Sequence, residues 1–203
     1  MAKLAPWAGA QPIQGTGYET VSMSAQEYYG RDTRQSPVTN DGTGGLTANA
    51  VFKQTGHPEF IEADNKSVGK VGGNVTITGR SNTKQIAVEL GSGDIAVTLP
   101  LTFTAAGAPH NVSSSGVMIS GDPGASDKYD FSITMSIPAN DSVETKSRIV
   151  KFTALGGMSA SPSVTQSAGD PYLRFVEEEV VTDWTGTPVP LHVESNIDWK
   201  IQV

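Results

Sequence analysis

The sequence contains no cysteine, so neither disulfide bonds nor thiolate metal sites can hold any part of the protein together. It also lacks any run that approaches the roughly 20 apolar residues of a membrane-spanning helix. The first residues, MAKLAPWAGAQPIQGTG, contain no apolar stretch of about 7–15 residues such as a secretory signal needs. We therefore expect a protein that is made in the cytoplasm and leaves it only as part of a larger particle.

Positive charge is scarce, because 14 Lys and Arg stand against 21 Asp and Glu, for a net charge of −7. The acidic excess is concentrated in residues 170–203, which carry two basic and seven acidic side chains. An acidic chain without a basic stripe is repelled by nucleic-acid phosphates and by anionic lipid surfaces. This charge distribution argues against nucleic-acid and membrane partners.

Glycine and proline are plentiful, at 22 and 12 residues, and they separate short segments in which apolar and polar residues alternate. The pattern predicts strands over 75–79, 86–90, 94–103, 117–120, 131–137 and 147–154. Short strands at this spacing, with turn residues between them, are typical of an immunoglobulin-like (Ig-like) β-sandwich. We predict an all-β fold with such a sandwich over residues 58–169.

Residues 1–57 do not show this alternation, because Gly, Pro, Ser, Thr and Gln interrupt every apolar run. We predict an extended, mostly irregular N-terminal arm that anchors the protein. One short helix is expected near 25–30, where Ser24 and Glu27 occupy capping-box positions and Gly30 is suited to end it.

An internal repeat relates residues 57–90 to residues 170–203. Pro58 aligns with Pro171, and Ser81-Asn82 aligns with Ser195-Asn196 at a separation of 114 residues. A period of this size indicates tandem domains. We therefore interpret residues 170–203 as the first strands of a second, incomplete Ig-like module, which two or three strands alone cannot stabilise.

The segment VPLHVESNIDWKIQV carries Ser195, Asn196, Asp198 and Trp199 in a strand–Ser-Asn–x-Asp-Trp–strand arrangement. This motif resembles the BACON family of Ig-like domains. The segment 136–169 resembles the family's closing strands, with Asn140, Arg148 and the run Val164-Thr165-Gln166 at matching positions. The first copy departs from the pattern, with Lys84-Gln85 in place of Asp-Trp.

The resemblance implies one of two settings, because BACON domains occur in exported bacterial proteins and in structural proteins of crAss-like phages. We predict a non-enzymatic virion protein, a head fibre or capsid decoration protein made in the host cytoplasm. Its expected partners are capsid proteins and identical subunits, in a homo-oligomer such as a trimer. Adhesion to host or mucus glycans is a further expected role. The alternative is a carbohydrate-binding adhesion module on the surface of a Bacteroidetes cell.

No residue pattern indicates catalysis, a cofactor or a metal centre. The three histidines, His57, His110 and His192, lie in no recognisable catalytic motif. Glu177, Glu178 and Glu179 are consecutive, and neighbouring strand residues point to opposite faces, so we interpret them as a solvated edge. Asp122, Asp127 and Asp130 are candidates for calcium binding or for ordinary acidic turns, and their spacing matches no EF-hand loop.

Isolated aromatic residues are the candidate contact sites. Trp7, Tyr18, Tyr28 and Tyr29 lie in the polar arm, and aromatic side chains dominate contact energies at protein interfaces. We predict that these four dock the arm onto a capsid or an identical subunit. Trp184 is expected to be exposed in a turn, where it is the candidate glycan contact. Trp199 shares an alternating face with Ile197 and Ile201, so we expect it in a core.

Overall fold

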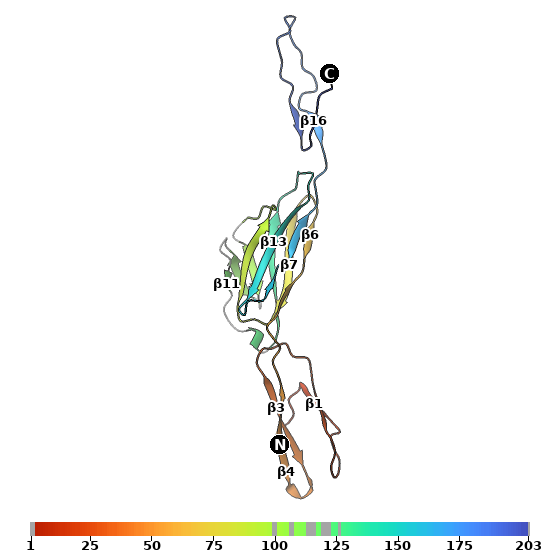
Figure 1. Ribbon diagram of the computed structural model, residues 1–203, viewed down its shortest axis with the longest axis vertical. Coiled ribbons are helices and arrows are strands. Elements are labelled where there is room, and N and C mark those ends of the chain that lie inside the picture. The colour runs from red at the N-terminus through yellow and green to blue at the C-terminus, as the bar shows by residue number, and fades with distance from the viewer. Residues whose placement is uncertain are drawn as a thin grey trace.

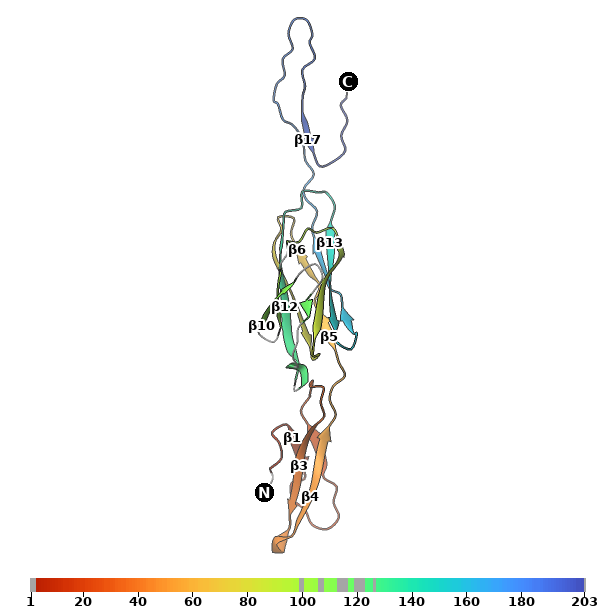
Figure 2. The ribbon, with the colours of Figure 1, turned by 90° about the vertical axis from the view of Figure 1, so that its left-hand side faces the viewer.

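The computed structural model describes residues 3–98, 101–105, 108–112, 117–118, 123–125 and 127–202. The molecule is elongated, with N-terminal hairpins at one end, a β-sandwich in the middle and a C-terminal hairpin at the other end (Figures 1 and 2). The hairpins at both ends and the central sandwich are built from β-strands. This confirms the predicted all-β fold class with an Ig-like module.

One layer of the sandwich is a five-stranded antiparallel sheet in the order β10-β9-β12-β7-β5. Its strands are β10 (Ala108–Val112), β9 (Leu101–Ala105), β12 (Tyr129–Ile137), β7 (Gly73–Ser81) and β5 (Ile61–Ala63). In β12, buried residues alternate with more exposed ones along the strand, as the sequence pattern predicts for a strand that packs on one face.

The second layer is a six-stranded sheet in the order β11-β8-β13-β15-β6, with β14 attached to β13. Its strands are β11 (Val117–Met118), β8 (Ile86–Gly93), β13 (Lys146–Ala154), β15 (Ser163–Gln166), β6 (Lys66–Val68) and β14 (Ser159–Ala160). The predicted break at residues 91–93 is absent, because these residues continue β8, and residues 94–98 are not strand. Ile119 and Ser120, the end of another predicted strand, lie outside the described residues.

The two sheets are joined where the chain passes from β5 in one layer to β6 in the other. β6, the second strand of the sandwich, then pairs in parallel with β15, the last strand. Asn65, between β5 and β6, accepts a hydrogen bond from Ser163 N at 2.9 Å and fixes this crossing.

The core between the layers is built on three phenylalanines. Phe131 lies 4.8 Å from Phe152 and 5.6 Å from Phe103, measured between ring centroids, and all three rings are buried. Phe103 and Phe131 come from the five-stranded sheet and Phe152 from the other, so the cluster joins the two layers. Burying such side chains supplies about 1.5–3 kcal/mol each.

The N-terminal region is more regular than the arm pattern indicates. It forms two antiparallel hairpins, the first of β1 (Ala8–Gln11) with β2 (Ser22–Ala25), the second of β3 (Arg34–Asp41) with β4 (Thr47–Gln54). The predicted helix at 25–30 is wrong, since Ser24 lies within β2 and residues 26–30 are irregular.

The C-terminal hairpin pairs β16 (Leu173–Phe175) with β17 (Val193–Ser195) and extends away from the sandwich (Figure 2). Its apolar side chains are exposed, including Phe175 and Trp199. The expected burial of Trp199 is therefore wrong for this chain, because 49% of its surface is accessible.

Candidate functional site: two hydrogen-bonded junctions and an exposed tryptophan

The junction between the N-terminal hairpins and the sandwich is centred on Asn82, which directly follows β7 and is fully buried. Its Oδ1 accepts a hydrogen bond from Phe60 N at 2.9 Å. Its Nδ2 donates to Tyr29 O at 2.7 Å and to Pro58 O at 3.1 Å. One side chain therefore holds the end of the N-terminal hairpins to the first strand of the sandwich.

Aromatic side chains pack around the same junction. The Tyr29 ring stacks on His57 with centroids 5.5 Å apart and contacts Phe60 at 5.9 Å. Lys128 Nζ lies 3.8 Å above the Tyr29 ring, a cation–π contact. The Tyr28 hydroxyl donates to Ala125 O at 3.1 Å. These contacts fix the direction in which the N-terminal hairpins leave the sandwich.

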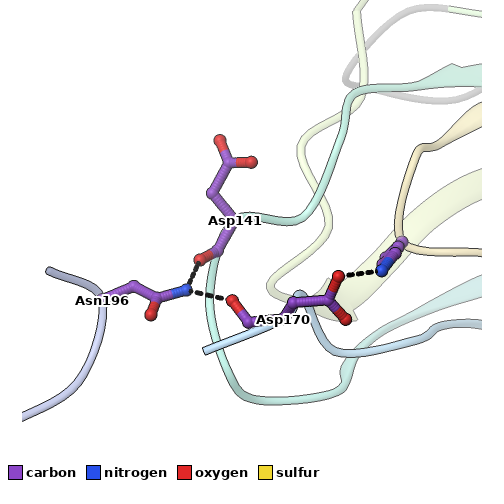
Figure 3. A network of polar contacts seen from close by, with 4 residues as sticks. Asp141, Asp170 and Asn196 are labelled. Carbon is purple, nitrogen blue, oxygen red and sulfur yellow. Dashed lines mark hydrogen bonds and ion pairs between the residues drawn. The ribbon is translucent and has the colours of Figure 1, made fainter. Parts of the chain in front are cut away.

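The junction at the opposite end of the sandwich repeats the arrangement with Asn196 (Figure 3). Tyr172 N donates to Asn196 Oδ1 at 2.9 Å, and Asn196 Nδ2 donates to Asp141 O at 2.6 Å and to Asp170 O at 2.9 Å. The Asp170 carboxylate forms an ion pair with Lys70 Nζ. Asn196 is more accessible than Asn82, because less of the chain packs over this end.

The serine before each asparagine also has the same role. Ser81 Oγ donates to Phe60 O at 2.7 Å, and Ser195 Oγ donates to Tyr172 O at 3.0 Å. The sequence repeat of Ser-Asn is therefore a repeat of hydrogen bonding, which we call the Ser-Asn motif. Because Ser81 bonds to Phe60 and Ser195 bonds to Tyr172, Phe60 corresponds to Tyr172 in the repeat. Pro58 therefore corresponds to Asp170, whereas the sequence comparison aligns it with Pro171.

Trp184 lies at the far tip of the C-terminal hairpin and is 96% exposed, as its turn sequence predicts. Asp183 organises the tip, because its carboxylate accepts hydrogen bonds from Thr185 N at 3.0 Å and from Thr187 N at 3.2 Å. Hydrogen bonds from Thr185 and Thr187 lower the pKa of the Asp183 carboxyl. The indole is thus presented on an ordered turn, free of intrachain cover.

The four arm aromatics do not form one surface. Tyr18 is fully exposed, whereas Tyr28 and Tyr29 lie at the junction described above. Trp7 stacks on Phe52 with centroids 5.8 Å apart, and the Arg34 guanidinium lies 4.4 Å from the Trp7 ring centre. The same guanidinium lies 4.2 Å from the centre of the Tyr28 ring. Docking of these aromatics onto a partner stays a prediction.

The acidic residues considered for catalysis or metal binding do not form a reactive cluster in the described part of the chain. Glu177 bonds to the backbone and ring of His192, and the hydrogen bond from the His192 side chain lowers the pKa of the Glu177 carboxyl. Across the part of the chain that the structure describes, no three His, Asp or Glu side chains gather where they could hold a metal ion. Asp122, one of the calcium candidates, lies outside the described residues.

Two further residues of the family-like motifs have positions that sequence reasoning alone did not assign. Arg148 donates to three carbonyl oxygens of the β8 end and the segment after it, Gly91 O, Gly93 O and Ile95 O, at 2.6–2.9 Å. Asn140 is buried and its Nδ2 donates to Glu144 O at 2.7 Å and to Ser167 O at 3.0 Å. Arg148 thus holds the end of β8 and the segment after it, and Asn140 holds the loop before β13 to the chain after β15, contacts that an alternation pattern cannot signal.

Among the residues that the structure describes, no helix has the length and apolar character required to cross a bilayer. A hollow of about 810 Å³ lies on the five-stranded sheet, bordered by Asp64, Asp130 and the ion pair between Arg80 and Glu62. Most of its lining residues are polar or charged, and these described residues include no cluster that resembles a catalytic centre.

Comparison with known proteins identifies no family. No family model and no curated protein matches the chain. Among solved structures, it is similar to the adhesin CfaE of enterotoxigenic E. coli, with a TM-score of 0.42 and 8% identity over 75% of this chain and 64% of that one. It is also similar to BcpA, the major pilin subunit of Bacillus cereus, with a TM-score of 0.34 and 10% identity over 88% and 65%.

A family 123 glycoside hydrolase from Clostridium perfringens also matches, with a TM-score of 0.33 and 9% identity over 54% of this chain and 27% of the hydrolase. The chain spans less than two thirds of the length of each of these three proteins. At this similarity the matches identify neither a family nor an activity, and the chain stands as an Ig-like β-sandwich protein with β-hairpins at both ends.

Proposed function

We propose that this protein is a non-enzymatic structural and adhesion protein whose Ig-like module is one element of a stiff rod. The observation that carries the proposal is the recurrence of the Ser-Asn motif at both ends of the sandwich. Asn82 ties the sandwich to the part before it, and Asn196 ties the part after it to the sandwich. A protein that only needed a flexible tether would not require side chains that bond across each junction.

Small-angle X-ray scattering tests this proposal on the full chain at low concentration. We expect an extended particle, because the three parts are fixed end to end. The variant Asn196→Ala removes the two hydrogen bonds from Nδ2 to Asp141 O and Asp170 O. Its distribution of interatomic distances should therefore broaden, and the largest distance should decrease. The control is Asn49→Ala, which removes one exposed hydrogen bond within a hairpin. A compact particle, or equal profiles for both variants, would refute the rod.

We further propose that the rod belongs to a virion, as a head fibre or capsid decoration protein, with the N-terminal region facing the capsid. The support is the BACON resemblance, together with exposed Tyr18 on the N-terminal hairpins. Antibodies against the chain should label purified phage particles. Labelling of bacterial cells alone would replace this assignment with the alternative, a bacterial surface adhesin.

Adhesion to glycans is the second function, and Trp184 is the residue that favours it. An exposed indole offers an apolar face and an N–H donor, a combination suited to a carbohydrate surface. On a glycan array, Trp184→Ala should lose any binding that the full chain shows. The control Trp7→Ala, at the other end of the molecule, should retain it. Equal binding by Trp184→Ala would exclude this residue as the contact.

A further inference from the structure

The β3–β4 hairpin has the same backbone pairing as the closing strands of the sandwich, displaced by 112 residues. Arg34 pairs with Gln54 and Pro37 with Val51 in the β3–β4 hairpin. In the sandwich, Lys146 pairs with Gln166 and Ile149 with Ser163. Each N-terminal pair becomes the corresponding sandwich pair when 112 is added to both residue numbers. We call residues 21–57 the closing segment.

Hydrogen bonds other than those between paired strands follow the same displacement of 112 residues. Gln54 Nε2 donates to Gln26 O at 2.9 Å, and Gln166 Nε2 donates to Pro138 O at 2.7 Å.

The backbone bond from His57 N to Gly30 O, 2.8 Å, corresponds to the bond from Gly169 N to Ser142 O, 2.7 Å. The bond that closes the hairpin turn, Gly42 N to Leu46 O, corresponds to Ala154 N to Met158 O, and both are 2.8 Å long. The closing segment therefore has the conformation of residues 133–169 without the rest of a sandwich around it.

The C-terminal hairpin repeats the opening strands of the sandwich in the same way. Leu173 pairs with Ser195 as Ile61 pairs with Ser81. The cross-strand ion pair of Arg80 with Glu62 recurs with its charges exchanged, as Arg174 with Glu194. The next backbone bond also recurs, because Val176 N to His192 O, 2.9 Å, corresponds to Asp64 N to Thr78 O, 3.0 Å. We call residues 170–202 the opening segment.

In each segment, apolar residues that correspond to the sandwich core are uncovered. Val75 and Ile77 of β7 are 6% and 0% exposed, whereas their counterparts, Val189 and Leu191, are 43% and 39% exposed. In the closing segment, the counterpart of fully buried Ile133 is Val21, which is 50% exposed. The closing segment is thus the last part of an Ig-like module without its opening strands. The opening segment is the first part of such a module without its closing strands.

We propose that the closing segment of one molecule packs onto the opening segment of a second molecule and, with it, completes most of an Ig-like module. The two segments of a single chain lie at opposite ends of the molecule and cannot meet (Figure 1). A second copy carries, at its other end, the strands that complement each segment. The inference rests on the proposed structural role and extends it, because it names the partner and the surface.

The sandwich supplies the register for this contact. In the β12–β7 pair, Met135 lies opposite Val75 and Ile133 lies opposite Ile77. Their counterparts place Met23 of one copy opposite Val189 of the other, and Val21 opposite Leu191. β2 has β1 as its one strand neighbour among the described residues, whereas β12 has two, so β2 has an edge that can accept a strand. Such a head-to-tail contact is heterologous and extends into a filament unless it closes into a ring.

Sedimentation velocity of the full chain over a range of concentrations tests the association. We expect the mass to grow with concentration in steps of one chain. Leu191→Asp should reduce the product to a monomer, because it places a carboxylate at the counterpart of a buried position. The control is Val71→Asp, which adds the same charge to a residue of the sandwich that is 78% exposed and should leave association unchanged. A monomer at every concentration would overturn the inference.

Cross-linking tests the register, because the chain has no cysteine of its own. Met23→Cys chains are mixed with Val189→Cys chains and treated with a short thiol-specific cross-linker. A heterodimer should form in this mixture and should be at least several-fold less abundant when Val71→Cys replaces Val189→Cys. Equal yields in both mixtures would refute the register. Failure here leaves the scattering result for the dilute monomer untouched, so the rod proposal and the assembly proposal can fail separately.

Discussion

Replacing Asn82 by alanine is the sharpest test of how the junctions are held. The substitution removes three hydrogen bonds and leaves Phe60 N, Tyr29 O and Pro58 O without their side-chain partner. Alanine cannot restore any of them, and water has little access because Asn82 is fully buried. The first strand of the sandwich and the end of the N-terminal hairpins lose their common attachment.

The expected magnitude follows from the burial. Leaving a buried donor or acceptor unsatisfied costs about 1–3 kcal/mol, and three such groups that relax together should cost about 3 kcal/mol. With a urea dependence of about 1–3 kcal/mol per molar, the unfolding midpoint of Asn82→Ala should fall by at least about 1 M. Urea titration followed by tryptophan and far-UV signals measures both quantities.

Asn196→Ala is the matched control, because it removes the same three types of hydrogen bond at a site that solvent reaches. Water can replace the lost bonds, so the free energy of unfolding should fall by about 1 kcal/mol or less. If both substitutions cost the same, or if Asn82→Ala costs less than about 1 kcal/mol, the argument from burial is wrong.

Three further outcomes follow from the sandwich, each measured by chemical denaturation. Phe152→Ala should cost about 3–5 kcal/mol because it opens a cavity between the sheets, whereas Asn40→Ala, at the exposed counterpart position, should cost little. Burial raises the pKa of Tyr129 to about 12, so stability should be fully present below about pH 10 and fall as pH rises towards 12; in Tyr129→Phe this alkaline loss should shrink. Gly72→Ala should destabilise more than Gly157→Ala. Both glycines have positive φ, but a Cβ at Gly72 would lie 2.2 Å from a backbone oxygen and one at Gly157 meets nothing.

The sequence predicted the parts of this protein that depend on local alternation. The pattern of β12 and β13 marks residues that face a core, because successive side chains of a strand point to opposite faces. The Ser-Asn repeat was visible for a similar reason, since two short polar residues at the end of a strand recur in nearly the same context. Trp184 was also predicted to be exposed from its turn sequence, and it is.

The relation of the N-terminal hairpins to the sandwich was hidden in the sequence. Asn40 stands where the sandwich has Phe152, and Ser36 stands where it has Arg148, so the apolar alternation that marks a strand is lost in the closing segment. Residues 1–57 were therefore expected to form a mostly irregular arm with one helix. Strand register and hydrogen-bond partners are properties of the backbone, and they retain the likeness after the side chains have diverged.

Sequence alone thus determined the all-β class and one pair of repeated polar residues, since these follow from period-two patterning and turn composition. Only the tertiary structure decided what those residues do. Whether Asn82 and Asn196 are surface turn residues or attachments between parts depends on which carbonyl lies within hydrogen-bonding distance, and a carbonyl 53 residues away in the chain reaches Asn82 only once the fold has formed.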